Sequence, residues 1–331
     1  MRADLRNIAP SIQRPLGRPL SLDEFADDVR AGLSTDGQKQ IPSKYLYDGL
    51  GSALFDAITL LPEYGLTRAD ARLLQKHAPE LTKRAQRLSV VAELGSGSGL
   101  KTRLVLDALD PANPVTYCPI DISPSALARC ERELRRNGLK IVPIEESYIA
   151  GLRLAATMRR KHTSMLVLFL GSTIGNFEPE AAIQLCSDVR NTLQPGDIFY
   201  LSTDLQKPVG RMIAAYDDAL GVTAAFNMNL LVRINRELKG TFDLSRFAHQ
   251  ATYNVREARI EMHLRSLEAQ TVAAGPNLVA RFRKDETIWT ESSYKFRSED
   301  LITLADQTGF RCEAQWIDKE WPFAQSLFRA V

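Results

Sequence analysis

Residues 90–102 join an apolar run to a helical pattern through a turn that contains Gly95, Gly97 and Gly99. The apolar run Val90-Val91-Ala92 predicts a buried strand, and the leucines and valine at positions 104–109 predict a helix. Glycine lets the backbone pass close to a ligand, and the first turn of the helix offers free N–H groups. This strand–turn–helix unit predicts an α/β fold with a parallel sheet.

The spacing of the glycines indicates which class of ligand the turn could bind. It lacks the third glycine of the dinucleotide fingerprint, and Lys101-Thr102 does not follow the spacing of a phosphate-binding loop. Glu93-x-Gly95-x-Gly97 instead resembles the first loop of methyltransferases that use S-adenosylmethionine (SAM). A tight strand–helix turn without any ligand is the alternative interpretation.

A second strand with an acidic end supports the ligand-binding interpretation. Residues 115–122 form an extended run that contains Asp121, and Ser123-Pro124 then begins a helix. Asp121 follows the first glycine by roughly 25 residues, which is close to the spacing at which an acidic side chain meets ribose hydroxyls. The alternative role of Asp121 is to cap the following helix.

Further along the chain, residues 165–170 form a continuous apolar run that predicts a central parallel strand, and polar residues 171–177 follow it. Strands are also expected over residues 141–144 and 198–202, a helix is expected to begin at Pro179, and a last strand is expected near residues 312–316. Residues 206–290 interrupt this alternation, with expected helices over 214–220 and 223–237 and a strand over 259–265. We therefore expect a doubly wound, Rossmann-like SAM-dependent sheet over residues 68–205 and 296–331. A smaller α+β substrate domain would cover 20–67 and 206–295, and residues 1–19 would form a loose arm.

Composition and charge restrict the partners. A net charge of +2 gives no general electrostatic reason to expect nucleic acid or an anionic membrane, and no apolar stretch reaches the length of a membrane span. The four cysteines have no CxxC spacing, so we expect free thiols and no metal site. The expectation is a cytoplasmic monomer that acts on a small molecule.

The chain resembles, over nearly its whole length, the histidine-specific Nα-methyltransferases of ergothioneine biosynthesis, which make hercynine. The matching segments are Lys44-x-x-Tyr47-Asp48, Leu61-Pro62-Glu63-Tyr64, Glu93-Leu94-Gly95-Ser96-Gly97, Leu168 to Asn176, Ala214-Ala215-Tyr216-Asp217-Asp218, Phe226-Asn227-x-Asn229, Asn235-Arg236-Glu237-Leu238, Arg259-Ile260-Glu261-Met262 and Thr290-Glu291-x-Ser293. The resemblance implies SAM-dependent trimethylation of the α-nitrogen of L-histidine.

The resemblance also implies roles for individual residues. Tyr64, Asn176 and Tyr216 would hold the α-amino and carboxylate groups of the substrate, and Glu291 with Ser293 would bind its imidazole. Phe55, Gly171 and Met262 would line the same pocket. The residues implied along the cofactor are Tyr47, Gly95, Lys101, Asp121, Ser147 and Tyr148. Tyr47 and Asn176 are the residues expected closest to the reacting atoms.

The chain departs from the family pattern in three places. Lys101 is preceded by Gly99-Leu100 rather than by a polar pair. Tyr64 is followed by Gly65 where the family usually has a second tyrosine, and Glu146-Ser147-Tyr148 stands where the family has Gly-Asp-Phe near the adenine. Two alternatives stay open beside histidine methylation: Nα-methylation of another amino acid or of a histidine derivative, and a SAM-binding regulatory protein without catalysis.

Overall fold

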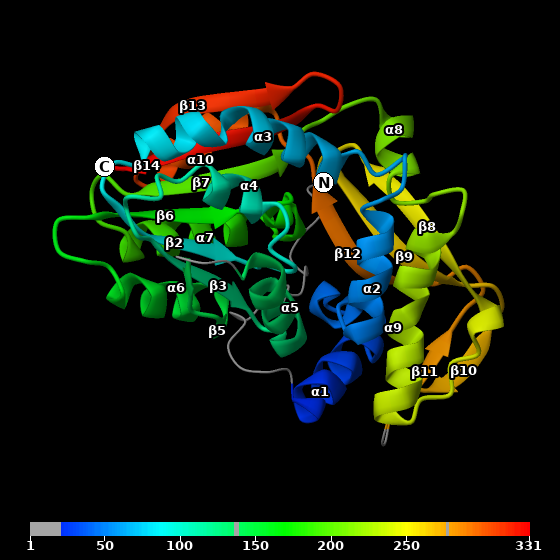
Figure 1. The fold of residues 1–331 in the computed structure, drawn as a ribbon. Coiled ribbons are helices and arrows are strands. Elements are labelled where there is room, and N and C mark those ends of the chain that lie inside the picture. The colour runs from blue at the N-terminus through cyan, green and yellow to red at the C-terminus, as the bar shows by residue number, and fades with distance from the viewer. Residues whose placement is uncertain (1–20, 136–138, 276–277) are drawn as a thin grey trace, which may run out of the picture.

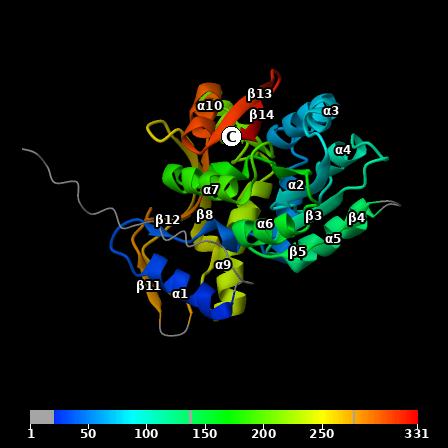
Figure 2. The same ribbon diagram turned by 90° about the vertical axis from the view of Figure 1, so that its left-hand side faces the viewer.

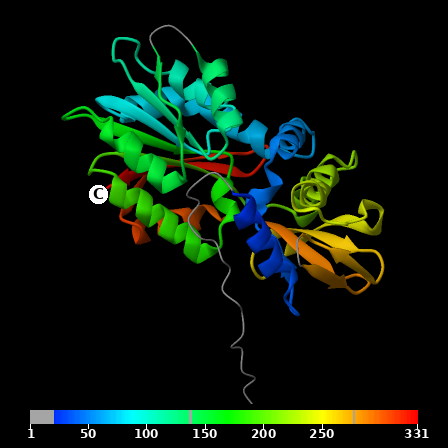
Figure 3. The ribbon, with the colours of Figure 1, turned by 90° about the horizontal axis from the view of Figure 1, so that it is seen from below.

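The structure is a computed structural model that describes residues 21–135, 139–275 and 278–331 (Figure 1). The arm expected over residues 1–19 lies outside the described residues. The elements gather around two sheets, a large central one and a smaller one beside it, as Figure 3 shows.

The central sheet has eight strands in the order β13-β14-β7-β6-β2-β3-β4, with β5 pairing β3. Strands β2 to β7 pair in parallel, whereas β14 is antiparallel to both β7 and β13. This confirms the predicted doubly wound α/β fold. The strands are β2 (Leu88–Leu94), β3 (Thr116–Asp121), β4 (Lys140–Ile141), β5 (Ile144–Glu145), β6 (Ser164–Phe169), β7 (Ile198–Asp204), β13 (Phe310–Asp318) and β14 (Phe323–Ala330).

Helices cover both faces of this sheet. A hydrophobic core cluster lies on each face of the sheet. Helices α3, α4 and α5 pack on one face, and α6, α7 and α10 pack on the other. Figures 1 and 2 show α3 and α4 opposite α6 and α7. The helices are α3 (Leu66–Arg84), α4 (Thr102–Asp107), α5 (Pro124–Leu134), α6 (Tyr148–Thr157), α7 (Pro179–Thr192) and α10 (Ser298–Gln307).

The smaller sheet has the order β1-β12-β9-β8, with a separate hairpin of β10 and β11. Its strands are β1 (Lys39–Gln40), β8 (Phe247–Asn254), β9 (Arg259–Ser266) and β12 (Thr287–Tyr294), and the hairpin strands are β10 (Gln270–Ala273) and β11 (Val279–Phe282). A third core cluster packs this sheet against α1 (Leu22–Leu33), α2 (Gly49–Ile58) and α9 (Val222–Leu238). The short elements are α8 (Val209–Ala214) and the 3₁₀ turns η1 (Ser43–Leu46), η2 (Thr173–Asn176) and η3 (Leu244–Arg246). The division of the chain into two domains stays a prediction.

Three expectations about single elements were wrong. Of residues 214–220, expected to be a helix, only Ala214 is helical, as the last residue of α8. The chain turns after it, and the carboxylate of Asp218 accepts the N–H groups of Val222 and Thr223 in the first turn of α9. The strand expected over 141–144 is split into β4 and β5 around Pro143, which has no N–H to donate. Strand β14 was not expected, because the polar residues Gln325 and Ser326 interrupt its apolar run although both are fully buried.

Candidate active site

The glycine-rich loop and the end of β3 meet at the carboxyl edge of the central sheet. Gly95 and Gly97 have φ values of 69° and 51°, a backbone region that L-residues rarely adopt. Asp121 accepts hydrogen bonds from the backbone N–H of Gly97 at 3.1 Å and from that of Ser123 at 3.0 Å. Burial raises the pKa of Asp121, and these hydrogen bonds oppose the rise. A carboxylate has about four lone-pair positions, so Asp121 keeps capacity for a ligand hydroxyl.

The two residues expected beside the adenine begin α6. Ser147 is the N-cap residue, and the ring of Tyr148 packs edge-on against Phe169, with ring centroids 5.5 Å apart. A Cβ atom on Gly95 would lie 3.3 Å from the hydroxyl oxygen of Tyr148. Glycine at position 95 therefore allows both the positive φ of the backbone and the close approach of the Tyr148 ring.

A β-bulge in β12 aims Glu291 and Ser293 into the protein. Strict alternation would place both residues on the same face as Trp289, but the register shifts between Trp289 and Glu291. Glu291 thereby lies opposite Met262, and Ser293 lies opposite Ile260, which are core-facing residues of β9. Residues directly opposite in an antiparallel pair share a face, so Glu291, Ser293 and Met262 come together as expected.

The buried carboxylate of Glu291 has two side-chain partners. Asn176 of η2 donates to its Oε1 at 3.0 Å, and the hydroxyl of Tyr47 donates to the same oxygen at 3.3 Å. Only 7% of Glu291 is exposed. Burial raises the pKa of Glu291 to about 7, although the bonds from Tyr47 and Asn176 and the charge of Lys295 oppose the rise. The carboxylate is thus poised to change its charge near neutral pH.

Aromatic rings surround this region. Tyr47 and Phe55 meet edge to face with centroids 5.6 Å apart, and Phe55 and Tyr64 do so at 6.1 Å. Tyr216 continues the row from Tyr64 at 6.0 Å. Phe226, which the sequence did not single out beyond its motif, contacts both Tyr47 and Phe55 at 5.4 and 6.0 Å. Burial raises the pKa of Tyr47, Tyr64 and Tyr216 well above the ordinary value, so their hydroxyls stay protonated.

Asp48, the residue after Tyr47, joins the motif around Tyr47 to the motifs on α9 that contain Asn229 and Arg236. Asp48 caps α2 through the N–H of Gly51, and it also accepts from Asn229 at 2.8 Å and Arg236 at 2.6 Å on α9. These bonds outweigh burial and lower the pKa of Asp48. The motif around Asn229 therefore holds the segment that carries Tyr47.

Asp70 connects a residue predicted to bind the cofactor with one predicted to line the substrate pocket, and the sequence analysis did not identify it. Its Oδ2 accepts from the ammonium of Lys101 at 2.7 Å and from the backbone N–H of Gly171 at 2.9 Å. Its Oδ1 accepts from Ser202 and Gln325. Asp70 lies on the buried stripe of α3, and a carboxylate at such a position is the signal that could have revealed it.

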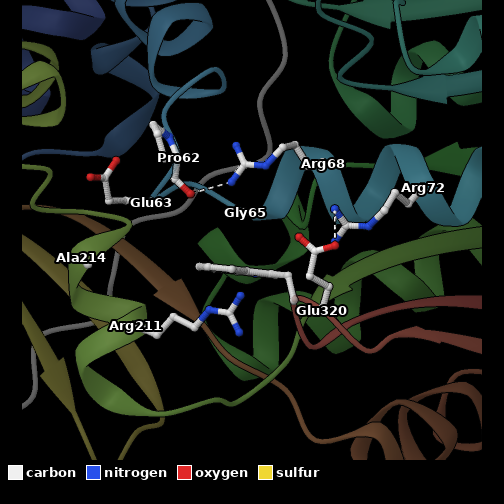
Figure 4. Close-up of a pocket in the computed structure, with 9 residues that line it drawn as sticks. Pro62, Glu63, Gly65, Arg68, Arg72, Arg211, Ala214 and Glu320 are labelled. Atoms are coloured by element: carbon white, nitrogen blue, oxygen red, sulfur yellow. Dashed lines mark hydrogen bonds and ion pairs between the residues drawn. The ribbon is translucent and has the colours of Figure 1, made fainter.

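The departure at Gly65 has a steric cause. A Cβ atom at this position would lie 2.2 Å from the indole of Trp321, so the tryptophan occupies the space that a second tyrosine would need. Gly65 and Trp321 also line a surface pocket of about 280 Å³, together with Arg68 and Arg72 of α3 and Arg211 of α8 (Figure 4). None of the residues predicted to bind substrate or cofactor lines it.

Within residues 21–135, 139–275 and 278–331, no group of three or more histidine, cysteine, aspartate or glutamate side chains is placed to hold a metal ion. In the same part of the chain, no helix combines the length and the apolar character that crossing a bilayer requires.

The sheet order, the glycine-rich loop and the acidic end of β3 define a Rossmann-like, SAM-dependent methyltransferase. The profile of one family, described as histidine-specific, SAM-dependent methyltransferases, matches residues 25–330. The chain belongs to this family.

Individual relatives agree with this assignment. The chain is 42% identical over 319 residues to histidine N-alpha-methyltransferase of Mycolicibacterium smegmatis, covering 94% of this chain and 98% of the relative. It is 37% identical to histidine N-alpha-methyltransferase of Mycobacterium tuberculosis, covering 96% and 98%. It is 28% identical to ergothioneine biosynthesis protein 1 of Neurospora crassa, where the match covers 85% of this chain and 32% of that longer protein.

Proposed function

We propose that this protein transfers methyl groups from SAM to the α-nitrogen of L-histidine, three times in succession, and so makes hercynine for ergothioneine biosynthesis. The observation that supports this most is the buried carboxylate of Glu291 beside Ser293 and a row of aromatic rings. The names of the relatives favour the same substrate and pathway.

The residues at the end of the central sheet suit the cofactor. A Cβ atom on Gly97 would meet nothing within 4 Å, so the space above the loop is open. Asp121 stands beside this space with acceptor capacity for ribose hydroxyls, and Tyr148 offers a ring to the adenine. When bound, SAM would supply a methyl group on a positively charged sulfur. Gly95, Lys101 and Ser147 complete the proposed cofactor set.

The protein's part in this reaction is to orient the amine and to remove it from water. An in-line transfer needs the amine lone pair, so the ammonium must lose its proton before each step. A free α-amine has a pKa of roughly 8–9, and an apolar, buried site lowers it. The faces of Tyr47, Phe55, Tyr64 and Tyr216 would then accept the growing positive charge of the methylated nitrogen through cation–π contacts. Asn176 would hold the α-groups beside them.

Recognition of the side chain follows from the cost of burying a charge. An ionised Glu291 would accept a hydrogen bond from an imidazole N–H, with Met262 packed nearby and Gly171 at the wall. A substrate without that N–H would leave the carboxylate buried and unpaired, which costs several kcal/mol. Histidine would therefore be preferred over purely apolar amino acids.

The test is Glu291→Ala, assayed with histidine, phenylalanine and tryptophan. A site built around a substrate N–H can discriminate by roughly 10⁴–10⁵-fold, so kcat/KM for histidine should fall by at least about a hundredfold. Activity on the apolar amino acids should rise relative to histidine. The matched control is Glu261→Ala, because Glu261 lies on the adjacent strand but faces away from the core. Full histidine activity in Glu291→Ala would overturn the substrate assignment.

Mass spectrometry of the wild type with SAM and each amino acid separates the alternatives. Trimethylated histidine supports the proposal, another methylated amino acid supports the first alternative, and no product supports a regulatory protein. A monomer in the cytoplasm remains our expectation, and light scattering of the full chain tests the oligomeric state.

A further inference from the structure

Three buried charges lie beneath the predicted substrate pocket. Asp204 ends β7, Lys207 follows it, and Lys295 follows β12. The side chains of both lysines are fully buried, and both pair with Asp204, through Oδ1 at 2.6 Å for Lys207 and Oδ2 at 3.0 Å for Lys295. Trp321 also donates its indole N–H to Asp204 at 2.8 Å. Burying so much charge is costly, which suggests that the cluster has a task beyond stability.

Lys295 makes one ion pair and two hydrogen bonds through its ammonium group. Besides Asp204, its Nζ contacts the hydroxyl of Tyr216 at 2.8 Å and that of Ser293 at 2.9 Å. An ammonium group donates and cannot accept. Both hydroxyl oxygens therefore accept from Lys295, and the hydrogen of each hydroxyl must point elsewhere.

The two hydroxyls are also neighbours. The oxygens of Tyr216 and Ser293 are 2.7 Å apart, so one of them donates to the other. The second hydroxyl hydrogen is then left over for a ligand. The pair as a whole presents a hydrogen-bond donor to the pocket, and Glu291, two residues before Ser293 on the same face of β12, presents an acceptor when ionised.

A donor beside an acceptor matches one form of imidazole. Neutral imidazole has one N–H and one nitrogen with a lone pair, whereas imidazolium has two N–H groups. We propose that Lys295 is a positioning residue that holds the hydroxyls of Tyr216 and Ser293 as donors, so that the pocket selects the neutral imidazole of histidine. This inference rests on the proposed function, because it takes histidine as the substrate.

Lys207 provides a contrast within the same cluster. It donates to Asp204 and to the backbone carbonyl of Leu205, and neither bond involves Tyr216 or Ser293. Burial lowers the pKa of Lys207 to about 8, with the nearby charge of Lys295 acting in the same direction and Asp204 opposing it. Replacing Lys207 removes a buried charge from Asp204 but leaves the two hydroxyls held by Lys295.

The experiment compares Lys295→Met with Lys207→Met. In Lys295→Met the hydroxyls are free to turn, so KM for histidine should rise on the order of tenfold from the lost hydrogen bonds, with a smaller change in kcat. Affinity for S-adenosylhomocysteine, measured by calorimetry, should stay within twofold. Lys207→Met should leave KM for histidine within about threefold.

The pH dependence of histidine binding supplies the readout that a purely structural role would not change. In the wild type, affinity for histidine should fall as the pH drops through the imidazole pKa of roughly 6.5. The second N–H of the imidazolium would then point at a hydroxyl group that also donates, and no hydrogen bond could form between them. Glu291, whose pKa burial raises to about 7, becomes protonated over the same pH range in both proteins, so the comparison between them isolates the effect of Lys295. In Lys295→Met the hydroxyl pair can accept from the second N–H, so the fall should become shallower.

Two outcomes overturn the role of Lys295: an unchanged KM for histidine, or a raised KM with the wild-type pH dependence. If Lys295→Met does not fold, the double variant Asp204→Asn with Lys295→Met removes both partners and tests the same two quantities. A wild type that neither binds nor methylates histidine would overturn the proposed function and this inference together. Wild-type activity with an unaffected variant would overturn only this inference.

Discussion

The carboxylate of Asp70 and the ammonium of Lys101 lie 2.7 Å apart, although one belongs to the helix before β2 and the other to the loop after it. The same carboxylate oxygen accepts the backbone N–H of Gly171 at the end of β6. One buried side chain thereby sets the distance between the loop predicted to hold the cofactor and the loop predicted to line the substrate pocket.

Asp70→Asn should weaken the binding of both SAM and histidine. It removes the charge that Lys101 faces and turns one acceptor oxygen into a donor, so we expect a loss of about 1–3 kcal/mol in the free energy of unfolding. KM should rise for both SAM and histidine. Glu80→Gln, which disturbs an exposed ion pair with Arg84 on the same helix, is the control and should cost less than about 0.5 kcal/mol. Lower stability with both KM values unchanged would show that Asp70 is only structural.

Asp121→Ala should weaken binding of SAM and S-adenosylhomocysteine by roughly 1.5–3 kcal/mol, the range for hydrogen bonds to a charged group. Calorimetry measures this directly. Because Asp121 also holds Gly97, the milder Asp121→Asn separates loss of charge from loss of the loop contact. Glu145→Ala is the matched control, since Glu145 pairs with Asp121 in the sheet register but is exposed. Equal affinity in wild type and Asp121→Ala would contradict the ribose role.

Gly65 and Trp321 should behave as a coupled pair. Gly65→Ala forces the indole to move and should cost about 1–3 kcal/mol of stability, as overpacking does. Trp321→Ala leaves a cavity and should cost about 3–5 kcal/mol. The double variant Gly65→Ala with Trp321→Ala relieves the overlap, so its loss should be smaller than the sum of the two single losses by about 0.5–3 kcal/mol. Additive losses in urea denaturation would mean that the two residues do not share this space.

Glu93 makes stability depend on pH. Burial raises its pKa to about 7, against the opposing hydrogen bonds from Thr102 and Tyr117. Between the unfolded value of about 4.3 and 7, the folded state holds a proton that the unfolded state lacks, so the contribution to stability falls as pH rises. It is fully present below this window and lost above it.

Glu93→Gln should therefore remove this contribution. The difference in unfolding free energy between wild type and variant should change by about 1–3 kcal/mol between pH 5 and pH 7.5, with the wild type losing more. Urea denaturation at several pH values measures it. A difference that does not vary with pH would show that Glu93 titrates normally.

Several parts of the fold and the candidate site could be predicted from local patterns. The glycine loop, the buried strand β6 and the helix that begins at Pro179 each follow from a short run of residues whose periodicity or turn chemistry is sufficient. The register of β12 and β9 brings Glu291, Ser293 and Met262 to one face, and the sequence analysis grouped these residues only through the resemblance to a family. Alternation alone would have grouped Glu291 with Trp289 on the opposite face.

The sequence by itself determined the fold class, the family and the identity of the residues at the strand ends, because these depend on neighbours within about ten positions or on motifs in a fixed order. Only the tertiary structure decided which buried polar groups satisfy one another. Asp70 meets Gly171, Lys295 meets Tyr216, and Gly65 leaves room for Trp321 across long separations in the chain. The physical reason is that a buried charge is tolerated only where a distant residue pairs with it, and a buried glycine only where a distant side chain fills the space that it leaves. The packing of the two sheets and their helices determines which residue is the partner, and this cannot be read from the local sequence.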